Sequence, residues 1–356
     1  MSDDFGFLER LLDAPGPSGF EMRAARVWRE EAESFAEKVW TDLYGNSMAA
    51  VNLSGSPRVM FAGHVDEIGL QVTHIDDEGF LYFSEIGGWD TQVLVGQRVR
   101  VIGKDGDVPG VIGKKPIHLM REEDRKKVSE ARDLWVDLGV TSREEAHELG
   151  VTVGDPMVLA TGSVRLAGDR IASRAIDNRI GAFVVLEAIR LLAQDPPSAA
   201  SAVAVATTQE EIGYSGGGAR SSAFALEPHV ALVVDVTFST DVPDVSKKEL
   251  GEHKLGSGPV LTRGSAAHPV VFERLVATAQ REGIPYSVQA APRATRTDAD
   301  GIFLTRSGVP TGVVSVPNRY MHSPSEMVSL HDLQAAAQLL AGFVRDMEAE
   351  TDLIPH

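Results

Sequence analysis

Two adjacent carboxylates, Glu210 and Glu211, follow an apolar segment at residues 201–209. Such a run predicts a central strand of a parallel sheet, apolar on both faces. Ligand sites in open α/β sheets form at the carboxyl ends of strands. Two neighbouring acids are costly to hold there without a positive partner. Because the chain has no cysteine, a divalent metal held by His, Asp and Glu is the leading explanation, and a metal-dependent hydrolase is the first hypothesis.

Potential metal ligands occur at five places where apolar segments end. They are His64 with Asp66, Asp177, Glu210 with Glu211, Asp235, and His322. Taken singly, each has a simpler explanation. A lone histidine is usually a hydrogen-bonded structural residue, Asp177 can cap a helix over 178–193, and Asp235 can be a turn residue at a strand end. The two glutamates alone are also compatible with a solvated turn.

Taken together, these residues have the composition of a two-metal site. Two imidazoles and three carboxylates can hold two divalent ions, with one aspartate between them. Three ligand carboxylates offset three of the four positive charges, and the remainder lowers the pKa of a shared water toward neutrality. A Glu-Glu dipeptide can supply one ligand and one general base.

The composition limits which binding partners and which cellular location are expected. The chain has 356 residues and a formal net charge of −17, so it repels nucleic acid and anionic membrane surfaces. No segment reaches the ~18 uninterrupted apolar residues of a membrane span, and the N-terminus lacks the basic start and apolar stretch of a signal peptide. The absence of cysteine excludes disulfides and thiolate sites and fits a cytoplasmic enzyme.

The pattern of apolar residues changes along the chain. Helices are expected at 3–13, 20–36, 142–149, 176–193, 267–282 and 330–349. Strands are expected at 59–62, 70–75, 80–86, 93–102, 151–159, 201–207, 230–236 and 311–316. The glycine-punctuated strands of the first half are typical of a small β-barrel or sandwich. We therefore expect an α/β domain made from residues 1–67 and 166–356, with a β-rich insert at 68–165.

Several motifs resemble those of the M42 family of metalloaminopeptidases, which includes the glutamyl and the tetrahedral (TET) aminopeptidases. The residues that carry the resemblance are 63–69 (GHVDEIG), 86–90 (IGGWD), 95–99 (VGQRV), 175–181 (AIDNRIG), 208–213 (TQEEIG), 234–237 (VDVT) and 319–324 (RYMHSP). The set is specific in its order and spacing, and it runs from about Leu8 to Phe343. It implies a zinc-peptidase-like catalytic domain with a central mixed sheet flanked by helices, which carries a small β-barrel or sandwich.

The resemblance also implies a role for each candidate site residue. Asp177 would bridge two metal ions, His64 and Asp235 would complete one site, and Glu211 and His322 would complete the other. Glu210 would be the general base, and Asp66 would orient His64. The implied reaction is removal of N-terminal residues from peptides. Zinc is the expected metal, with cobalt or manganese as alternatives.

The resemblance further implies that the insert serves assembly. In similar proteins this domain forms dimers that build a dodecameric tetrahedral shell, so a homo-oligomer is expected. A dimer, or a lid domain without assembly, is the simpler alternative.

One stretch departs from the common family pattern. Many relatives have a glycine-rich turn before Thr-Asp-Ala, whereas this chain has residues 292–300 (PRATRTDAD). Arg293 and Arg296 are either part of the substrate pocket or ordinary surface residues. We expect neutral aliphatic N-terminal residues such as leucine to be preferred, with acidic ones second.

Three other functions compete with this interpretation. The first is a carboxypeptidase or deacylase on the same metal core. The second is an endoglucanase-type glycosidase, which needs a pair of carboxylic acids and no metal and so leaves both histidine motifs unexplained. The third is a structural particle with a vestigial metal site, which the complete set of ligands disfavours.

Overall fold

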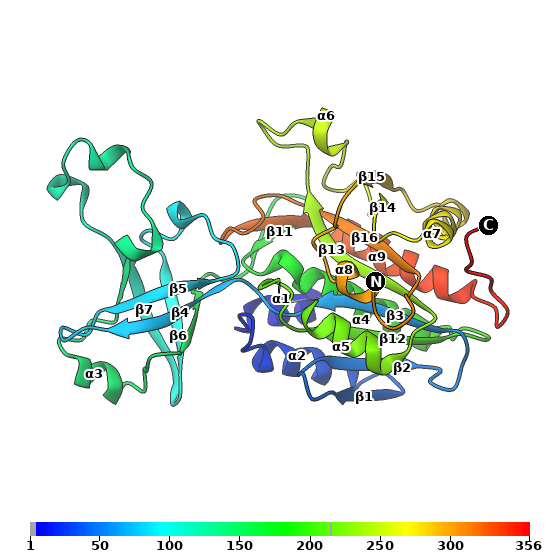
Figure 1. Cartoon of the computed structure of the whole chain (residues 1–356), viewed down its shortest axis with the longest axis horizontal. Coiled ribbons are helices and arrows are strands. Elements are labelled where there is room, and N and C mark those ends of the chain that lie inside the picture. The colour runs from blue at the N-terminus through cyan, green and yellow to red at the C-terminus, as the bar shows by residue number, and fades with distance from the viewer. Residues whose placement is uncertain (1–4, 214–215) are drawn as a thin grey trace.

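The computed structural model describes residues 5–213 and 216–356, and it has two parts that lie side by side (Figure 1). One part is a large sheet covered by helices, and the other is a β-barrel that projects from it. The expected α/β class with a central mixed sheet flanked by helices is confirmed. The insert that the sequence left open between a barrel and a sandwich is a closed barrel.

The main sheet has eight strands. In spatial order they are β1 (Lys38–Thr41), β2 (Ser47–Val51), β12 (Ser201–Thr207), β3 (Arg58–His64), β13 (Val230–Phe238), β16 (Thr311–Asn318), β14 (Val260–Gly264) and β15 (Ser287–Ala291). The four strands β12, β3, β13 and β16 run parallel to one another. Strand β2 is antiparallel to both of its neighbours, whereas β14 is antiparallel to β16 and parallel to β15. The carboxyl ends of the four parallel strands therefore meet at one edge of the sheet.

Helices cover both faces of this sheet, because the central strands are apolar on both sides. The helices are α1 (Phe5–Asp13), α2 (Met22–Ala32), α4 (Ile176–Gln194), α5 (Gly217–Leu226), α7 (Pro269–Glu282), α8 (Ala299–Ile302) and α9 (Leu330–Arg345). A further short helix, α6 (Lys247–Leu250), has no buried residue and projects from the sheet in the connection between β13 and β14. In β3, Val59 and Phe61 join the core formed with α1, α2, α4, α7 and α9. The alternate residues Met60 and Ala62 join a second core with α5 and α8.

The barrel closes through six antiparallel strands. In order they are β4 (Gly69–Ile75), β5 (Leu81–Ile86), β8 (Trp135–Asp137), β7 (Gly106–Gly113), β6 (Arg98–Gly103) and β9 (Pro156–Leu159). Its connections contain the helix α3 (Arg143–Glu148) and four 3₁₀ turns, at Thr91–Val93, Ile117–Leu119, Asp124–Lys126 and Ala131–Asp133. A separate core fills the barrel and includes Leu70, Val99, Val136 and Met157. The exact domain boundaries at 67 and 166 stay a prediction.

A small antiparallel sheet connects the barrel to the site. It consists of β10 (Val164–Arg165), β11 (Arg170–Ser173) and β17 (Glu326–Ser329). Glu326 in β17 is paired in register with Ser173 in β11. This register brings Glu326 beside the chain segment that leads to Asp177.

Some element boundaries differ from the expected ones. The strand expected at 93–102 begins only at Arg98, because a 3₁₀ turn occupies Thr91–Val93. The strand expected at 151–159 begins at Pro156, and the helix expected at 20–36 ends at Ala32. The first two residues of the helix expected at 3–13 lie outside the described residues. Among the described helices, none is long and apolar enough to cross a membrane.

Candidate metal centre

His64 lies at the end of a central strand. It is the last residue of β3, and it is 1% exposed because β12 and β13 flank that strand on both sides. Its Nδ1 lies 3.3 Å from both Oδ1 and the backbone oxygen of Asp66. Since both of these oxygens are acceptors, Nδ1 carries the proton of the neutral ring. The other ring nitrogen, Nε2, faces Asp177, whose Oδ1 lies 3.4 Å away.

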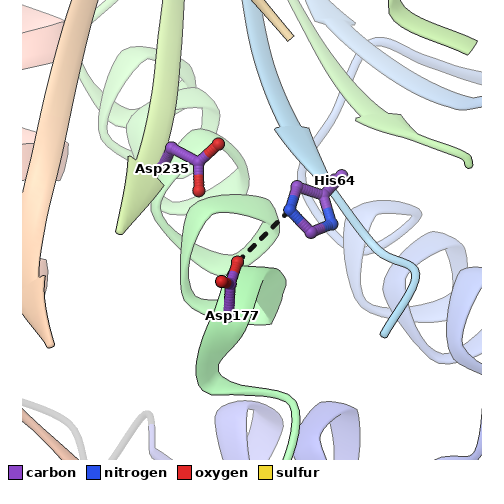
Figure 2. A group of neighbouring side chains, drawn as sticks. All are labelled: His64, Asp177 and Asp235. Carbon is purple, nitrogen blue, oxygen red and sulfur yellow. Dashed lines mark ion pairs between the residues drawn. The ribbon is translucent and has the colours of Figure 1, made fainter. Parts of the chain in front are cut away.

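Asp235 projects from the neighbouring strand. It lies within β13 rather than in a turn, so its interpretation as a strand-end turn residue is wrong. Its side chain is buried, and its Oδ1 accepts a hydrogen bond from the backbone N–H of Val236. Figure 2 shows His64 and Asp235 on adjacent strands, with Asp177 between them.

The residue that follows Asp177, and not Asp177 itself, caps the start of α4. Asp177 and Asn178 have non-helical backbone angles at the start of α4. The Asn178 side chain accepts from the backbone N–H of Gly181, three residues on, which is the bond of an N-cap. The expectation that Asp177 caps this helix is therefore wrong, and its carboxylate is available to the site.

Two glycines let the start of α4 approach the sheet closely. A Cβ added to Gly63 would lie 2.4 Å from the backbone carbon of Gly181. A Cβ added to Gly181 would lie 2.6 Å from the backbone oxygen of Val234. Backbone atoms cannot move aside as a flexible side chain can. Glycine at both positions therefore allows Asp177 to reach the residues at the ends of β3 and β13.

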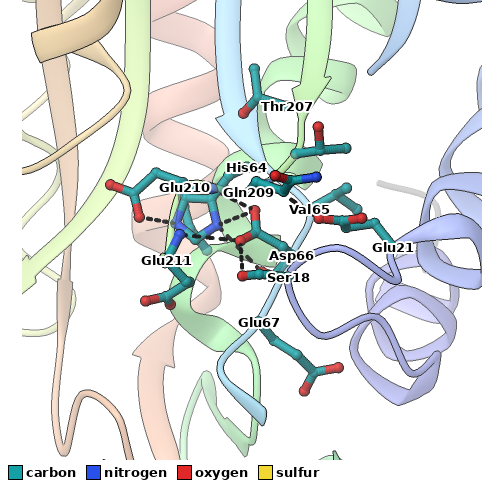
Figure 3. A network of polar contacts seen from close by, with 12 residues as sticks. Ser18, Glu21, His64, Val65, Asp66, Glu67, Thr207, Gln209, Glu210 and Glu211 are labelled. Carbon is teal, nitrogen blue, oxygen red and sulfur yellow. Dashed lines mark hydrogen bonds and ion pairs between the residues drawn. The ribbon is translucent and has the colours of Figure 1, made fainter. Parts of the chain in front are cut away.

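Glu210 and Glu211 lie in the turn that follows β12, and Asp66 holds their backbone. The Glu210 N–H donates to Asp66 Oδ1 at 3.2 Å, and the Glu211 N–H donates to Asp66 Oδ2 at 3.1 Å. The Ser18 hydroxyl donates to the same Oδ2 at 2.5 Å. Figure 3 shows this network, in which one buried carboxylate connects the N-terminal loop, His64 and both glutamates.

His322 comes from the loop between β16 and β17, and the barrel side of the molecule orients its ring. Its Nδ1 donates to the backbone oxygen of Gly88 at 2.8 Å. Its backbone N–H donates to Glu326 Oε1 at 2.8 Å, and the Asp177 N–H donates to Glu326 Oε2 at 2.9 Å. The Nε2 of His322 then lies 3.4 Å from Asp177 Oδ2 and 3.3 Å from Glu211 Oε2.

These residues form two groups that share one carboxylate. His64, Asp177 and Asp235 make one group, and Asp177, Glu211 and His322 make the other; within each group the possible ligand atoms lie within 4.8 Å of one another. Glu210 is in neither group, but its Oε2 lies 3.6 Å from His64 Nε2. The structure therefore brings together all seven residues singled out in the sequence. Their individual roles stay a prediction.

The electrostatics of the cluster favour a cation. Burial and the neighbouring carboxylates Asp235 and Asp298 raise the pKa of Glu210 to about 10, although His64 opposes the shift. Burial and the Asp177 carboxylate raise the pKa of Glu211 to about 7. Burial also raises the pKa of Asp235 well above its usual value. Each shift means that the ionised form lacks sufficient positive charge nearby.

The pKa shifts of the two imidazoles and of the shared Asp177 favour their charged forms. Hydrogen bonds to Asp177 and Glu211 raise the pKa of His322 to about 11. Burial would lower the pKa of His64, but Asp66 and then Asp177 raise it well above its usual value. Burial opposes ionisation of Asp177, yet hydrogen bonds from the two histidines hold its pKa at about 2. The cluster thus carries more negative charge than its two rings can neutralise.

The donor set fits divalent metal ions. Each group offers one imidazole Nε2 and two carboxylates, a combination suited to zinc, cobalt or manganese. One further observation supports a bound cation. Glu211 Oε1 is buried and has no hydrogen-bond partner within the described part of the chain. Unsatisfied buried carboxylate oxygens are rare in proteins, and a bound cation satisfies one directly.

A cavity of about 590 Å³ opens beside Glu210 and Glu211. Arg296 contributes to its wall, whereas Arg293 lines only a second cavity of about 340 Å³, which Arg296 also borders. Of the two arginines that the sequence singled out, only Arg296 therefore lies next to the candidate metal centre.

Sequence reasoning missed three acids that support this site. Glu326 accepts the two backbone N–H groups described above, and Asp298 accepts a hydrogen bond from the Thr207 hydroxyl at the end of β12. Glu67 forms buried ion pairs with Arg174 and Arg179. Glu326 follows His322 by four residues and Glu67 follows Asp66 directly, so proximity in sequence was the available signal. Asp298 belongs to the Thr-Asp-Ala motif, which was considered only for its arginines.

The sequence and the fold match known proteins over nearly the whole chain. Residues 45–339 match the family described as M42 glutamyl aminopeptidase. The lysyl aminopeptidase of Pyrococcus furiosus is 35% identical over 97% of this chain and 98% of that protein. The TET aminopeptidase from the marine sediment archaeon Thaumarchaeota archaeon SCGC AB-539-E09 has a TM-score of 0.92 at 37% identity, covering 97% of each chain. The Pyrococcus horikoshii TET1 peptidase, which can assemble into a tetrahedron or a large octahedral shell, has a TM-score of 0.85 at 31% identity, covering 96% of this chain and 99% of its own.

Proposed function

Because the chain belongs to the M42 family and is a peptide hydrolase of the aminopeptidase type, we propose that it uses two divalent metal ions to remove N-terminal residues from peptides. The family expected from the motifs is thereby confirmed. The proposed ligands are His64, Asp177 and Asp235 for one ion and Asp177, Glu211 and His322 for the other. The observation that carries the proposal is the shared Asp177, whose two oxygens each lie 3.4 Å from the Nε2 of a different histidine.

A contact at Nδ1 orients each of the two histidine ligands. Asp66 and the Gly88 carbonyl accept from the Nδ1 atoms of His64 and His322, so that both Nε2 atoms face the carboxylates. Glu326 holds the backbone of both Asp177 and His322. When bound, the ions supply Lewis acidity toward the scissile carbonyl and lower the pKa of the attacking water.

Glu210 is the proposed general base. It is outside both ligand groups, and its Oε2 lies 3.6 Å from Nε2 of the proposed ligand His64. We propose that its carboxylate takes a proton from the attacking water and gives that proton to the leaving amine. Asp66 fixes its position through the backbone N–H of Glu210 itself.

We favour an aminopeptidase over a carboxypeptidase or deacylase on the same core, because relatives that are similar over nearly the whole chain are named aminopeptidases. Zinc is the proposed metal, and cobalt or manganese are accepted by the same ligands.

The test is hydrolysis of a panel of aminoacyl p-nitroanilides by protein stripped of metal and reloaded with zinc, cobalt or manganese. We expect activity only after reloading, with two ions per chain by elemental analysis. Blocking the substrate's N-terminus should abolish the activity. Activity that survives chelation would contradict the metal mechanism and revive the glycosidase alternative, and activity on blocked substrates would favour a deacylase.

We also propose that the chain forms a homo-oligomer through its barrel part, up to a dodecameric shell. Support comes from the structural similarity to the TET1 peptidase of Pyrococcus horikoshii. The domain boundaries at 67 and 166 and the cytoplasmic location stay predictions.

A further inference from the structure

The cavity of about 590 Å³ beside Glu210 is lined by two arginines, Arg220 and Arg296. Arg220 lies on α5, and Arg296 lies on the loop before α8. Within the described residues, neither guanidinium forms an ion pair or a side-chain hydrogen bond. Both side chains are exposed to solvent at this cavity, so their charges are available to a ligand.

The acids of the same wall are already engaged. Both oxygens of Asp300 accept from the chain, Oδ1 from Thr295 and Oδ2 from the backbone N–H of Arg296. Asp298 is only 2% exposed and is bonded to the Thr207 hydroxyl. Glu210 and Glu211 have proposed roles in the metal centre. These contacts do not remove the negative charges, but they leave the two guanidinium groups as the charged side chains of the described wall that have free hydrogen-bond donors.

The backbone at Arg296 has an unusual conformation. Its φ is 57°, in the left-handed region where residues other than glycine are uncommon. Asp300 holds this turn through its bonds to the backbone of Thr295 and Arg296. A strained residue that the surrounding structure holds in place is a frequent feature of ligand sites. The turn places Arg296 on the cavity wall.

We propose that this cavity binds the side chain of the substrate's N-terminal residue and selects an acidic one, glutamate or aspartate, through Arg296 and Arg220. The inference rests on the proposed aminopeptidase function. Family membership does not decide the matter, since the names of the relatives include both lysyl and glutamyl aminopeptidases. The inference also reverses the order expected from the sequence, in which neutral aliphatic residues came first.

The geometry of the wall suits a short acidic side chain. Leu304 borders the same cavity and offers an apolar surface to methylene groups. Guanidinium groups bind carboxylates through charge-assisted hydrogen bonds, which are stronger than neutral ones. A lysine ammonium group in this place could not accept a hydrogen bond from either guanidinium group.

The test compares glutamyl and glutaminyl p-nitroanilide, which have nearly the same shape and differ in charge. These substrates carry no C-terminal carboxylate, so the comparison reports only the side chain. We expect kcat/KM for the glutamyl substrate to exceed that for the glutaminyl substrate by about tenfold or more, the factor that one hydrogen bond to a charged group supplies. The ratio should fall as salt is added, because both arginines are exposed.

Two variants assign the selectivity to the named residues. Arg296→Gly removes the charge and leaves a residue that adopts a positive φ without strain, so the fold is retained. It should lower the glutamyl-to-glutaminyl ratio about tenfold, and Arg220→Gln should act in the same direction. Arg293→Gln is the matched control, since Arg293 has the same charge, lies on the same loop and is outside this cavity. It should leave the ratio unchanged.

Binding provides a readout that is independent of turnover. By calorimetry, free L-glutamate should bind more tightly than L-glutamine to the metal-loaded protein, and Arg296→Gly should remove the difference. If glutaminyl or leucyl anilides are cleaved as well as the glutamyl one, or if the ratio survives Arg296→Gly, the selectivity is overturned and the aminopeptidase function stands. If no anilide is cleaved under any metal, the proposed function itself fails.

Discussion

Asp66 illustrates how one buried carboxylate can organise a reaction site. It accepts hydrogen bonds from the Ser18 hydroxyl and from the backbone N–H groups of Glu210 and Glu211, and it faces Nδ1 of His64. Ionisation is therefore favoured despite complete burial, and the pKa of Asp66 lies below its usual value. An amide at this position would place an N–H₂ group against donors.

We expect Asp66→Asn to weaken metal binding by about 10- to 100-fold, the usual cost of losing a group that orients a metal-ligating histidine. The measurement is a competition titration with a chromophoric zinc chelator. Ser18→Ala is the control, because it removes only one of the hydrogen bonds to Asp66 and should cost much less. Equal affinity of Asp66→Asn and wild type would contradict the orienting role.

Glu210 and Glu211 serve as controls for each other, since they are adjacent and chemically identical. Glu210→Gln should retain two metal ions and lose about 10²–10³-fold in kcat, as expected when a general base is removed. Glu211→Gln should retain only one tightly bound ion, because Glu211 belongs to a ligand group and Glu210 does not. Elemental analysis and steady-state kinetics on both variants separate the two roles, and reversed results would exchange the assignments.

Glu21 should make the stability of the protein depend on pH. Burial and then the Asp66 carboxylate raise its pKa from 4.5 to about 7. The folded state therefore binds a proton more tightly than the unfolded state, and stability falls as the pH rises from about 4.5 to about 7. Above pH 7 the full cost, up to about 3 kcal/mol, is present.

Glu21→Gln keeps the side-chain oxygen that accepts from the backbone N–H groups of Gly19 and Gln209. The variant should therefore melt a few degrees higher than wild type at pH 8 and at the same temperature at pH 4.5. Scanning calorimetry at both pH values, with the same metal content, checks this. A gain at pH 4.5 equal to that at pH 8 would assign the effect to packing rather than to the charge.

The elements that reach the site could be predicted from their apolar runs. The strands β3, β12, β13 and β16 are buried on both faces, and such strands read as continuous apolar segments. The strands β14 and β15 were not predicted, because they lie toward one edge of the sheet and their apolar residues are few and interrupted by polar ones. Their pairing depends on long-range contacts that have no local signal.

The candidate ligands could be predicted, whereas much of what supports them could not. His64, Asp177, Glu211, Asp235 and His322 each follow or end an apolar segment, so their residue types and positions are visible in the sequence. The Gly88 carbonyl that orients His322 is a backbone atom, which no residue pattern distinguishes. The capping role of Asn178 was missed for a related reason, since Asp177 and Asn178 are equally good caps by residue type.

The close approach of β3 and α4 gives a prediction at the scale of elements. Gly63→Ala should destabilise the protein by about 3 kcal/mol or more, since the added methyl group meets the backbone of Gly181. It should also weaken metal binding, because it moves Asp177 away from His64. Gly162→Ala is the control, since its added Cβ would meet only Asp13 Oδ1 at 3.7 Å. A variant with unchanged melting temperature and metal affinity would contradict this account of the approach.

The molecule as a whole combines a sheet that carries the proposed ligands with a barrel that is large enough for its own core. We expect the chain to assemble into particles of many copies, up to twelve chains of 38.2 kDa each. Size-exclusion chromatography with light scattering measures this directly. A mass of one or two chains would exclude a shell and leave the barrel as a dimerisation or lid domain.

The hydrogen bond from His322 to the Gly88 carbonyl crosses from one part of the molecule to the other. A chain trimmed to the sheet and its helices would therefore be an incomplete catalyst even if it folded, because one imidazole would be free to rotate. For the same reason, a barrel transplanted from a relative would have to reproduce the path of this one loop as well as the outer surface of the donor. In this protein, a redesign of the barrel is therefore also a redesign of the candidate metal centre.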